Sequence, residues 1–385
     1  MPLSVSMYTP WRAQCGISDY SRWLVEALRS LPEIEDLDIL EAREAEPAGG
    51  LGSLLRYAKE ERIYRELARE ARGGLIHIQH QYFFFGGVAP HKNHARAFLN
   101  GLRVPAVMTV HEIAGASPST TQASQTSFVV QQAVNWTNRA NFLHPRIRAL
   151  IVHTSTDREV LVRLGARADI VHHLPHPVPL AAAMPSHDVA LRRWGLEGKR
   201  CVMLFGFLAN KKGHALALDM MSHLPPDVVL LFAGGQHPQD HTDYVPRLRA
   251  RIANEGLFNR VRITDYLAEA DIPGIMAATD VAIAPFLQSS GSGSLANLFA
   301  YGRAVVASDI PPHREIAQEH PAPMALFPSG DAVALAEQVN SLLDLTHPAR
   351  RNALQSASYE YAQRHSYLEM ARSTAQIYRS VVTSS

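Results

Sequence analysis

The stretch Ala284–Glu315 reads APFLQSSGSGSLANLFAYGRAVVASDIPPHRE, and it decides the fold class. It predicts a strand, a turn rich in glycine and serine, a helix that begins near Ser292 or Gly293, and another strand from Ala304. The first N–H groups of a helix lack partners within the helix, and the helix dipole is positive at that end. The turn therefore suits an anion such as phosphate, as in nucleotide-binding α/β proteins.

The rest of the chain repeats this alternation of short apolar strands and helical stretches. Strand, helix and strand at this spacing predict parallel βαβ units, with helices on both faces of each sheet. The expected strands form two sets of six. They are 3–8, 36–41, 75–79, 105–110, 149–153 and 168–174, followed by 200–206, 227–233, 260–264, 280–284, 303–307 and 323–327.

A proline-rich segment, PHPVPLAAAMPS at 175–186, separates the two sets and predicts a linker. We therefore expect a Rossmann-like N-terminal domain over 1–180 and a second one over 187–365. These two doubly wound domains should face each other across a cleft. Apolar residues recur every three or four positions in the last helix, about 366–385, so it should dock back on the first domain.

Composition describes a soluble globular protein of two domains: 385 residues, 46% apolar, 19% charged and a net charge of +1. This balance gives no case for nucleic-acid binding. No run approaches the roughly 18 to 20 apolar residues that span a bilayer, and the N-terminus does not resemble a signal peptide. Cys15 and Cys201 lie far apart in sequence, so we expect no disulfide and a cytoplasmic location.

Nineteen histidines invite a metal-site hypothesis, above all the pairs His77/His80 and His237/His241. No cysteine or carboxylate ligand stands at a suitable spacing, and the first pair need not share a face of its strand. We therefore expect core or surface histidines and no metal.

In open α/β sheets, ligands bind at the carboxyl ends of the strands, so the residues after each strand are candidates. Gly16, after the first strand, either lets the loop approach a phosphate or belongs to an ordinary turn. Its neighbour Cys15 fits a small buried thiol better than a nucleophile. His111 and Glu112, after the fourth strand, are candidates for substrate contact, with a hydrogen-bonded structural histidine as the alternative.

The third strand is followed by His80 and Gln81, which should lie at the edge of the cleft. The aromatic run Phe83–Phe85 comes next. It could receive a substrate or touch a membrane surface, but we favour packing beneath a loop. A helix near 56–72 carries basic residues that its glutamates nearly cancel, so strong binding to anionic lipid is not expected, although peripheral membrane contact stays open.

In the second set, the turn GFLANKKG at 206–213 follows the first strand. A lysine there can hold a diphosphate, and we assign this role to Lys212 and a solvated position to Lys211. Later strand ends carry Gly235, Tyr266 and Leu267, which are placed to frame a base.

Several segments together resemble one family: CGISDY, HIQHQ, PAVMTVHE, IVHTSTDREVL, HLPHPV, LFGFLANKKG, VRITDYLAEADIPGIMAATDVAIAPF and AYGRAVVASD. In this order they resemble the retaining glycosyltransferases of family 4, which have the GT-B fold. The resemblance covers nearly the whole chain. It implies transfer of a hexose-type sugar from a nucleotide-sugar, a UDP- or GDP-sugar, to a hydroxyl of a glycan, lipid-linked glycan or glycoside, without a metal or other cofactor.

The resemblance also implies roles for single residues. Lys212 matches the lysine that holds the diphosphate, while the usual arginine of that turn falls on Phe207. His111 matches the histidine that contacts the donor sugar or phosphate, and Gly16 matches the glycine of the first loop. Residues on the N-terminal domain would bind the acceptor, and the candidates there are His80, Gln81 and Glu112.

One segment departs from the family. Two glutamates, eight positions apart, usually contact the donor sugar and the ribose, and they fall on Ser289 and Asn297, which can hydrogen-bond but carry no charge. The loop residues Ser290, Gly291, Ser292 and Gly293 would then bind the sugar and phosphate. The loop resembles a variant branch of the family. Two alternatives stay open: a nucleotide-binding partner of another transferase that has lost catalysis, and a GT-B nucleotide-sugar epimerase.

Overall fold

The computed structural model describes residues 2–43, 53–115, 128–237 and 242–383, with the backbone alone for residues 53 and 54. The chain divides into two compact units. Unit 1 comprises Met1–Pro175 and Tyr367–Ser385, and unit 2 comprises His176–Ser366.

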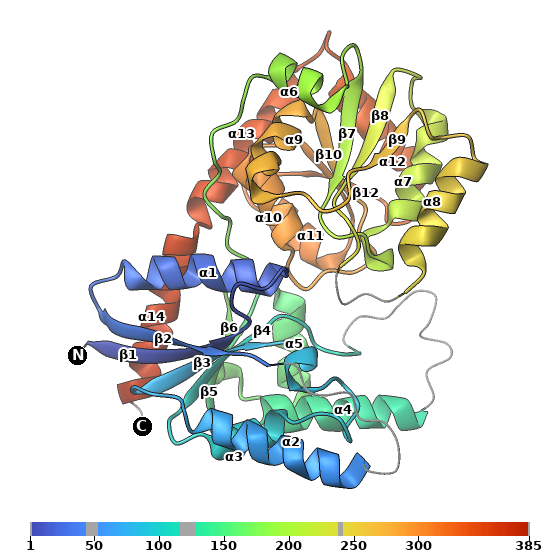
Figure 1. The fold of residues 1–385 in the computed structure, drawn as a ribbon. Coiled ribbons are helices and arrows are strands. Elements are labelled where there is room, and N and C mark those ends of the chain that lie inside the picture. Colours follow the sequence, from blue (N-terminus) through green and yellow to red (C-terminus); the bar gives the residue numbers. More distant parts are fainter. Residues whose placement is uncertain (1, 44–52, 116–127, 238–241, 384–385) are drawn as a thin grey trace. The chain divides into compact units, whose positions relative to one another are not determined.

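Unit 1 holds a six-stranded sheet of parallel neighbours in the order β2-β1-β3-β4-β5-β6 (Figure 1). The strands are β1 (Leu3–Thr9), β2 (Ile34–Glu41), β3 (Leu75–His80), β4 (Ala106–Val110), β5 (Ile147–Val152) and β6 (Val171–His173). Helices cover both faces of the sheet and enclose one core on each.

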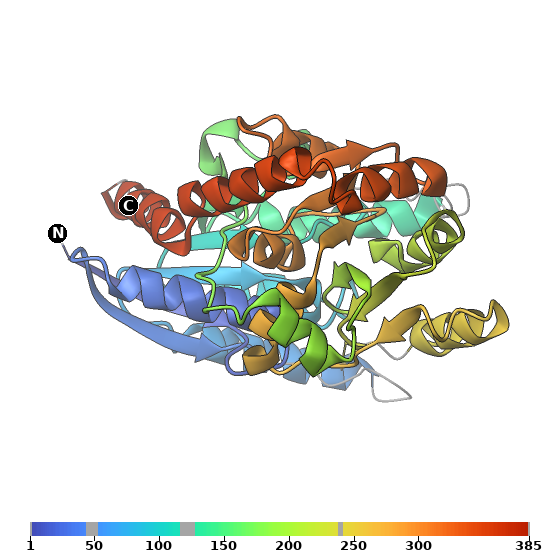
Figure 2. The same ribbon diagram turned by 90° about the horizontal axis from the view of Figure 1, so that it is seen from above.

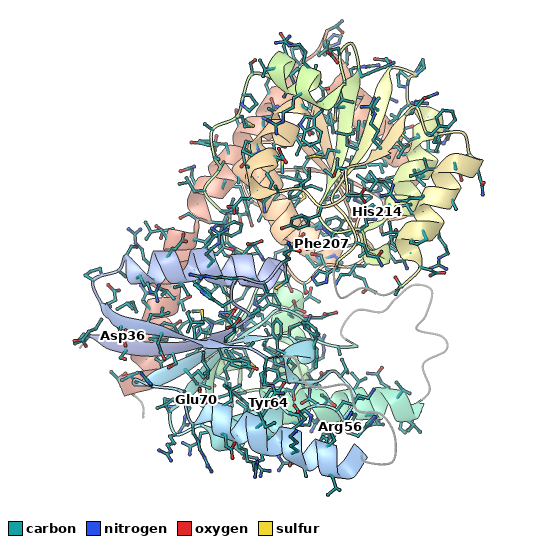
Figure 3. All side chains as sticks on the ribbon, in the orientation of Figure 1. Asp36, Arg56, Tyr64, Glu70, Phe207 and His214 are labelled. Atoms are coloured by element: carbon teal, nitrogen blue, oxygen red, sulfur yellow. The ribbon has the colours of Figure 1, made fainter. Side chains whose placement is uncertain are left out.

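One face of this sheet packs on α1 (Gly16–Arg29) and α14 (Tyr367–Thr383). The other packs on α2 (Ser53–Ala68), α3 (Ala95–Gly101), α4 (Phe128–Phe142), α5 (Ser155–Leu164) and the short turn η1 (Tyr82–Phe85). Successive residues of a strand point to opposite faces, so Met7 of β1 faces the first core and Tyr8 the second. Figure 3 labels Arg56 and Tyr64 on α2, Glu70 just after the end of α2, and Asp36 on β2.

Unit 2 repeats the plan with the order β12-β11-β10-β7-β8-β9, again parallel throughout. The strands are β7 (Arg200–Phe205), β8 (Val228–Ala233), β9 (Val261–Ile263), β10 (Val281–Ala284), β11 (Val305–Ser308) and β12 (Ala325–Phe327). Its two cores lie on opposite faces of the sheet. Figure 2 shows the layers of each unit from a second direction.

On one face of this sheet lie α6 (His187–Trp194), α9 (Ile272–Ala278), α10 (Gly293–Ala300), α11 (Pro311–Ala317) and α13 (Ala349–Arg364). On the other lie α7 (His214–Met220), α8 (Tyr244–Asn254) and α12 (Ala332–Leu343). The short 3-10 turns are η2 (Ala168–Ile170), η3 (Asn210–Lys212), η4 (Met221–His223) and η5 (Glu269–Asp271).

The expected α/β fold with two parallel sheets is confirmed, and each of the twelve expected strands is present. Residues 168–170, expected as the start of the sixth strand, form η2 instead. The helical C-terminal segment is two helices, because the helix stops at Arg364 and a new one starts at Tyr367. The apolar stripe of α14 is buried in unit 1.

In each sheet the strand order reverses once. In unit 2 the chain runs outward through β8 and β9 and returns to add β10 on the other side of β7. In unit 1 the reversal lies between β1 and β3. Open α/β sheets bind ligands at the carboxyl ends of the strands at this position. The loops after β7 and β10, and those after β1 and β3, are therefore the places to look.

Candidate active site

The turn after β7, residues 206–213, packs directly on the loop after β10. The Leu287 N–H donates to the Lys211 carbonyl at 2.8 Å. A Cβ on Gly213 would lie 1.9 Å from the Pro285 carbonyl oxygen, so no larger residue fits there. In Figure 3 the labelled residues Phe207 and His214 lie at the two ends of this turn. The two loops at the reversal point of unit 2 thus pack against each other.

The side chain of Lys212, at the end of η3, points back toward these two loops. Its Nζ donates to Ser294 Oγ at 2.7 Å and to the Phe205 carbonyl at 3.4 Å, and it lies 5.5 Å from the centre of the Phe286 ring. Gly206 makes room for it: its φ is +105°, and a Cβ there would lie 2.4 Å from Nζ.

The electrostatics of Lys212 favour an incoming anion. Burial, helped by the charge of neighbouring Lys211, lowers the pKa of Lys212 to about 7. Both hydrogen-bond acceptors of Nζ are neutral oxygen atoms. An anion within contact distance would stabilise the protonated amine and raise its pKa. Lys211, which the sequence placed in solvent, is exposed.

The helix α10 starts beside this lysine. Ser292 is its N-cap, and Ser292 Oγ accepts from the Leu295 N–H at 3.3 Å. Ser292 Oγ also lies 3.1 Å from Ser294 Oγ, which in turn accepts the hydrogen bond from Lys212 Nζ. The preceding Gly291 has φ +106°. The helix was expected to start at Ser292 or Gly293, and α10 begins at Gly293.

The other residues expected at the donor site have mixed surroundings. Ser289 and Ser290 are half-buried in the loop before α10. Phe207 packs edge-on against the ring of His237, with centroids 4.7 Å apart. Asn297 uses its amide N–H to bond the Gly293 carbonyl of its own helix, at 2.8 Å.

The residues expected to frame a base lie at neighbouring strand ends of unit 2. A Cβ at Gly235 would lie 2.9 Å from the Tyr266 backbone nitrogen, so the loops after β8 and β9 touch there. The Tyr266 side chain is 56% exposed. Leu267 packs partly against the core that includes α10.

In unit 1, His111 follows β4 directly. Its Nε2 lies 2.8 Å from Oε1 of Gln79, a fully buried residue of the neighbouring strand β3. Its ring meets Tyr20 of α1 edge-on at 4.9 Å between centroids, and His153, after β5, at 5.7 Å. His111 itself is half-buried.

The prediction that His80 contacts the acceptor is corrected by its burial. His80 is completely buried, stacks on Phe85 and meets Phe142 edge-on, and its Nε2 lies 3.1 Å from the Asn141 amide nitrogen. Burial lowers the pKa of His80 well below its usual value. His80 is the last residue of β3, and its side chain points into the core rather than along the strand end.

Gln81 and Glu112, the other two acceptor candidates, do lie together. The Gln81 amide donates to Glu112 Oε2 at 2.8 Å, and its oxygen accepts from the Tyr82 N–H at 2.6 Å. The pair joins the loops after β3 and β4, and Glu112 is the residue that follows His111. Glu112 is exposed.

The structure places Gly16 and Cys15 at the start of α1. Gly16 is exposed, and a Cβ added there would meet no atom within 4 Å. Cys15 is half-buried, and Cys201 is buried in the other unit; the two form no disulfide.

The aromatic run after β3 packs under a loop, as favoured: Phe84 and Phe85 are buried and Phe83 is half-buried. This burial removes two of the three rings from a membrane-facing role. Exposed apolar side chains lie instead on α4, where Phe128 is 78% and Trp136 is 50% exposed. In the described part of the chain, no helix has both the length and the apolar character to span a membrane.

The histidine pairs do not form a metal site among the described residues, which hold no cluster of three potential His, Cys, Asp or Glu ligands. His77 contacts Tyr378 of α14, and His80 contacts Asn141 of α4, so the two point to opposite faces of β3. Of the second pair, His241 lies outside the described residues.

Sequence reasoning missed three residues near these sites. Ser294 stands one position beyond the loop residues that were singled out, and Gln79 was hidden in a buried strand. His176, in the proline-rich segment, lies beside the start of α10: a Cβ on Gly293 would be 3.9 Å from its ring. Burial lowers the pKa of His176 to about 4, so this ring is neutral.

Known proteins resemble this chain in both sequence and fold. Residues 199–345 match the family described as "Glycosyl transferases group 1". Unit 2 thus carries the sequence pattern of group 1 glycosyltransferases. The match runs from β7 through α12 and includes Lys212 and α10.

Two curated relatives are also similar in sequence to this chain. A 2-deoxystreptamine glucosyltransferase from Streptomyces kanamyceticus is 27% identical over 255 residues, which are 63% of this chain and 62% of that protein. A mannosylfructose-phosphate synthase from Agrobacterium fabrum is 29% identical over 142 residues, 34% of this chain and 31% of that protein. The chain thus covers less than two thirds of either relative.

Solved structures share the fold along the whole chain. Sucrose-phosphate synthase from Thermosynechococcus elongatus has a TM-score of 0.79 at 18% identity and covers 100% of both chains. Anabaena Alr3699/HepE, in complex with UDP-glucose, has a TM-score of 0.72 at 18% identity and covers 98% of this chain and 100% of that one. The two parallel six-stranded sheets with flanking helices are those of GT-B glycosyltransferases.

Proposed function

We propose that this chain is a retaining glycosyltransferase of the family 4 type. It would move a hexose-type sugar from a UDP- or GDP-sugar to a hydroxyl group of a glycan, lipid-linked glycan or glycoside. The observation that carries this proposal is the position of Lys212, which meets the start of α10 at the point where the strand order of unit 2 reverses. The match of residues 199–345 to group 1 glycosyltransferases supports it, as does the UDP-glucose complex of Alr3699/HepE.

The chemistry follows from this arrangement. The bond between the anomeric carbon and the diphosphate oxygen breaks, and negative charge grows on the leaving diphosphate. The Lys212 ammonium and the first N–H groups of α10 stabilise that charge. The acceptor hydroxyl forms its new bond on the same face of the sugar, and its proton passes to the leaving phosphate oxygen. Unit 1 would bind the acceptor, with Gln81 and Glu112 as contacts, and His111 would contact the donor sugar.

Calorimetric titration with UDP, GDP and ADP tests the donor site. The wild type should bind UDP or GDP, and Lys212→Ala should weaken that binding at least tenfold. Lys199→Ala is the matched control, because Lys199 is an exposed lysine of the same unit whose charge is not among the causes of the lowered Lys212 pKa. If no nucleotide binds, or if both variants bind like the wild type, the assignment of the donor site is wrong.

One observation favours a second candidate, a nucleotide-binding partner without catalysis. The two positions that usually carry glutamates hold Ser289 and Asn297, and the Asn297 amide N–H is engaged by its own helix. Incubation with a UDP- or GDP-sugar, with and without glycoside acceptors, separates the alternatives. Nucleotide binding without turnover would favour the partner, and a changed sugar without acceptor would favour an epimerase.

A further inference from the structure

Gln79, a buried residue of β3, contacts His111 just after the end of β4. We propose that Gln79 is a positioning residue: it holds neutral His111 as the tautomer that carries its hydrogen on Nε2. The role of His111 in sugar transfer rests on the proposed function, but the tautomer does not. Hydrogen-bond contacts between side chains of β3 and β4 link Gln79 to His111 and to His77, and His77 to Thr109.

The first step is the orientation of the Gln79 amide. One end lies 2.8 Å from His111 Nε2, and the other faces Met7 Sδ at 4.0 Å and His77 Nε2 at 3.4 Å. A thioether sulfur accepts hydrogen bonds and never donates them. The amide nitrogen, which only donates, therefore belongs beside the sulfur, and the amide oxygen belongs beside His111. Because that oxygen only accepts, the hydrogen between them sits on His111 Nε2.

The second step is the support beneath the amide. His77 Nε2 lies 2.8 Å from Thr109 Oγ1, and its Nδ1 lies 2.6 Å from the hydroxyl of Tyr378 on α14. Gln79, His77 and Thr109 have no exposed surface. Burial lowers the pKa of His77 far below its usual range, so this ring is neutral. With its hydrogen on Nδ1, toward the Tyr378 hydroxyl, its Nε2 can accept the Gln79 N–H. Two strands and a helix thus fix the amide.

The fixed amide of Gln79 determines which ring nitrogen of His111 is open to protonation. The Nε2 hydrogen is committed to Gln79, so a proton that reaches the neutral ring must go to Nδ1. A ligand group that hydrogen-bonds the neutral ring at Nδ1 must donate. A sugar hydroxyl can do so, and an ionised phosphate oxygen cannot. Gln79 therefore favours contact of His111 with a hydroxyl of the donor sugar over contact with its phosphate.

Three other groups lie near the His111 ring. Tyr20 meets the ring with its edge, and burial keeps the pKa of Tyr20 far above neutrality, so it stays uncharged. His153 lies 5.7 Å away between ring centroids. The carboxylate of Glu112, the next residue, is engaged by Gln81.

The test is NMR of the full chain labelled with ¹⁵N-histidine, with the His111 signals assigned by their loss in His111→Asn. In the wild type, the couplings of neutral His111 should show hydrogen on Nε2. Gln79→Glu places a carboxylate at the same contact, which favours the imidazolium. It should raise the pKa of His111 by at least one pH unit. Gln132→Glu, an exposed change of the same kind in unit 1, should leave it unchanged.

Neutral His111 with hydrogen on Nδ1, or an unchanged titration in Gln79→Glu, would overturn the proposal. The wild-type tautomer needs no variant, so the proposal stays testable if the buried glutamate prevents folding. Gln79→Met, which removes both hydrogen bonds at similar length, should leave a mixture of tautomers.

Kinetics separate this inference from the proposed function. Gln79→Met should lower kcat at least tenfold and leave UDP or GDP affinity within twofold of the wild type. Gln79→Glu should move one limb of the pH–rate profile by the same amount as the NMR titration. If His111 carries its hydrogen on Nε2 but the protein binds no nucleotide, the proposed glycosyltransferase function is wrong and the role of Gln79 stands. Normal turnover in Gln79→Met would reject the role of Gln79 and keep the function.

Discussion

The affinity for a nucleoside diphosphate should fall as pH rises above 7. Burial lowers the pKa of Lys212 to about 7 in the free protein, while a bound diphosphate favours the ammonium and raises that pKa. The protonated form is therefore the one that binds. The neutral fraction grows through pH 7, so each further pH unit should weaken binding by up to tenfold, about 1.4 kcal/mol.

The magnitude can be worked out for one titrating group. With a pKa of about 7 in the free protein, half of the lysines carry a proton at pH 7 and about a hundredth at pH 9. Affinity should therefore drop roughly fiftyfold over this range, if the pKa of the complex exceeds 9. The second pKa of a phosphate is about 6, so the ligand contributes little in this window.

The assay is calorimetric titration of UDP and GDP at pH 7, 8 and 9, in buffers of different ionisation enthalpy. At pH 8 binding should take up nearly one proton. Lys212→Arg is the informative variant, because a guanidinium stays charged throughout, so its binding should not depend on pH. Wild-type affinity that changes by less than twofold from pH 7 to 9, without proton uptake, would refute the reasoning.

Three further changes have expected outcomes. Ser294→Ala removes the 2.7 Å bond to Lys212 Nζ, and nucleotide affinity should change several-fold in calorimetry, with the pH midpoint shifted. Gly206→Ala puts a Cβ where it would lie 2.4 Å from Nζ and forces a φ of +105°, so the variant should bind nucleotide at least tenfold more weakly. Tyr378→Phe leaves Nδ1 of buried His77 without its partner, and should lower the free energy of unfolding in urea by about 1–3 kcal/mol.

Matched controls isolate each effect. Ser186→Ala changes an exposed serine whose side chain caps no helix. Gly198→Ala imposes a similar backbone strain, at φ +70°, where a Cβ meets no atom within 4 Å. Tyr359→Phe changes a tyrosine that is 56% exposed. If a control matches its test variant, the contact assigned to that test variant is not the cause.

Much of the fold follows from the sequence because its signals are local. Short stretches between helical patterns, with apolar residues in a run or in alternation, located every strand, and the serine before a glycine located the start of α10. The sixth strand was expected too long because residues 168–170 form the 3-10 turn η2. Their side chains do not distinguish this turn from a strand.

The site was less predictable because its contacts join distant parts of the chain. Lys212 and Ser294 are 82 positions apart, and only the packing of two loops brings them within 2.7 Å. Similarly, alternation along β3 separates His77 from His80, but it does not say which of them meets a polar partner in α14. His80 was expected at a strand end exposed to ligand, and the following turn η1 covers it.

The helix α4 shows a further limit of periodicity. Its polar residues Thr137, Asn138 and Asn141 are buried, while Phe128 and Trp136 are exposed. Two of these buried side chains bond backbone carbonyls: Thr137 donates to the Val88 carbonyl, and Asn138 donates to the Ala114 carbonyl. A prediction from hydrophobicity alone would bury the exposed apolar face of this helix and expose its buried polar residues.

The departures at the donor site fit together once Lys212 is placed. Phe207 stands where the family resemblance expects an arginine, and Ser289 and Asn297 stand where it expects glutamates, so one cation and two anions are absent. The hydrogen-bond acceptors of Lys212 are neutral, and its pKa is already low. With no arginine in the turn to share the diphosphate, its binding depends on the protonation of one lysine. The charge lost at Phe207 is therefore the reason to expect strong pH dependence in this chain.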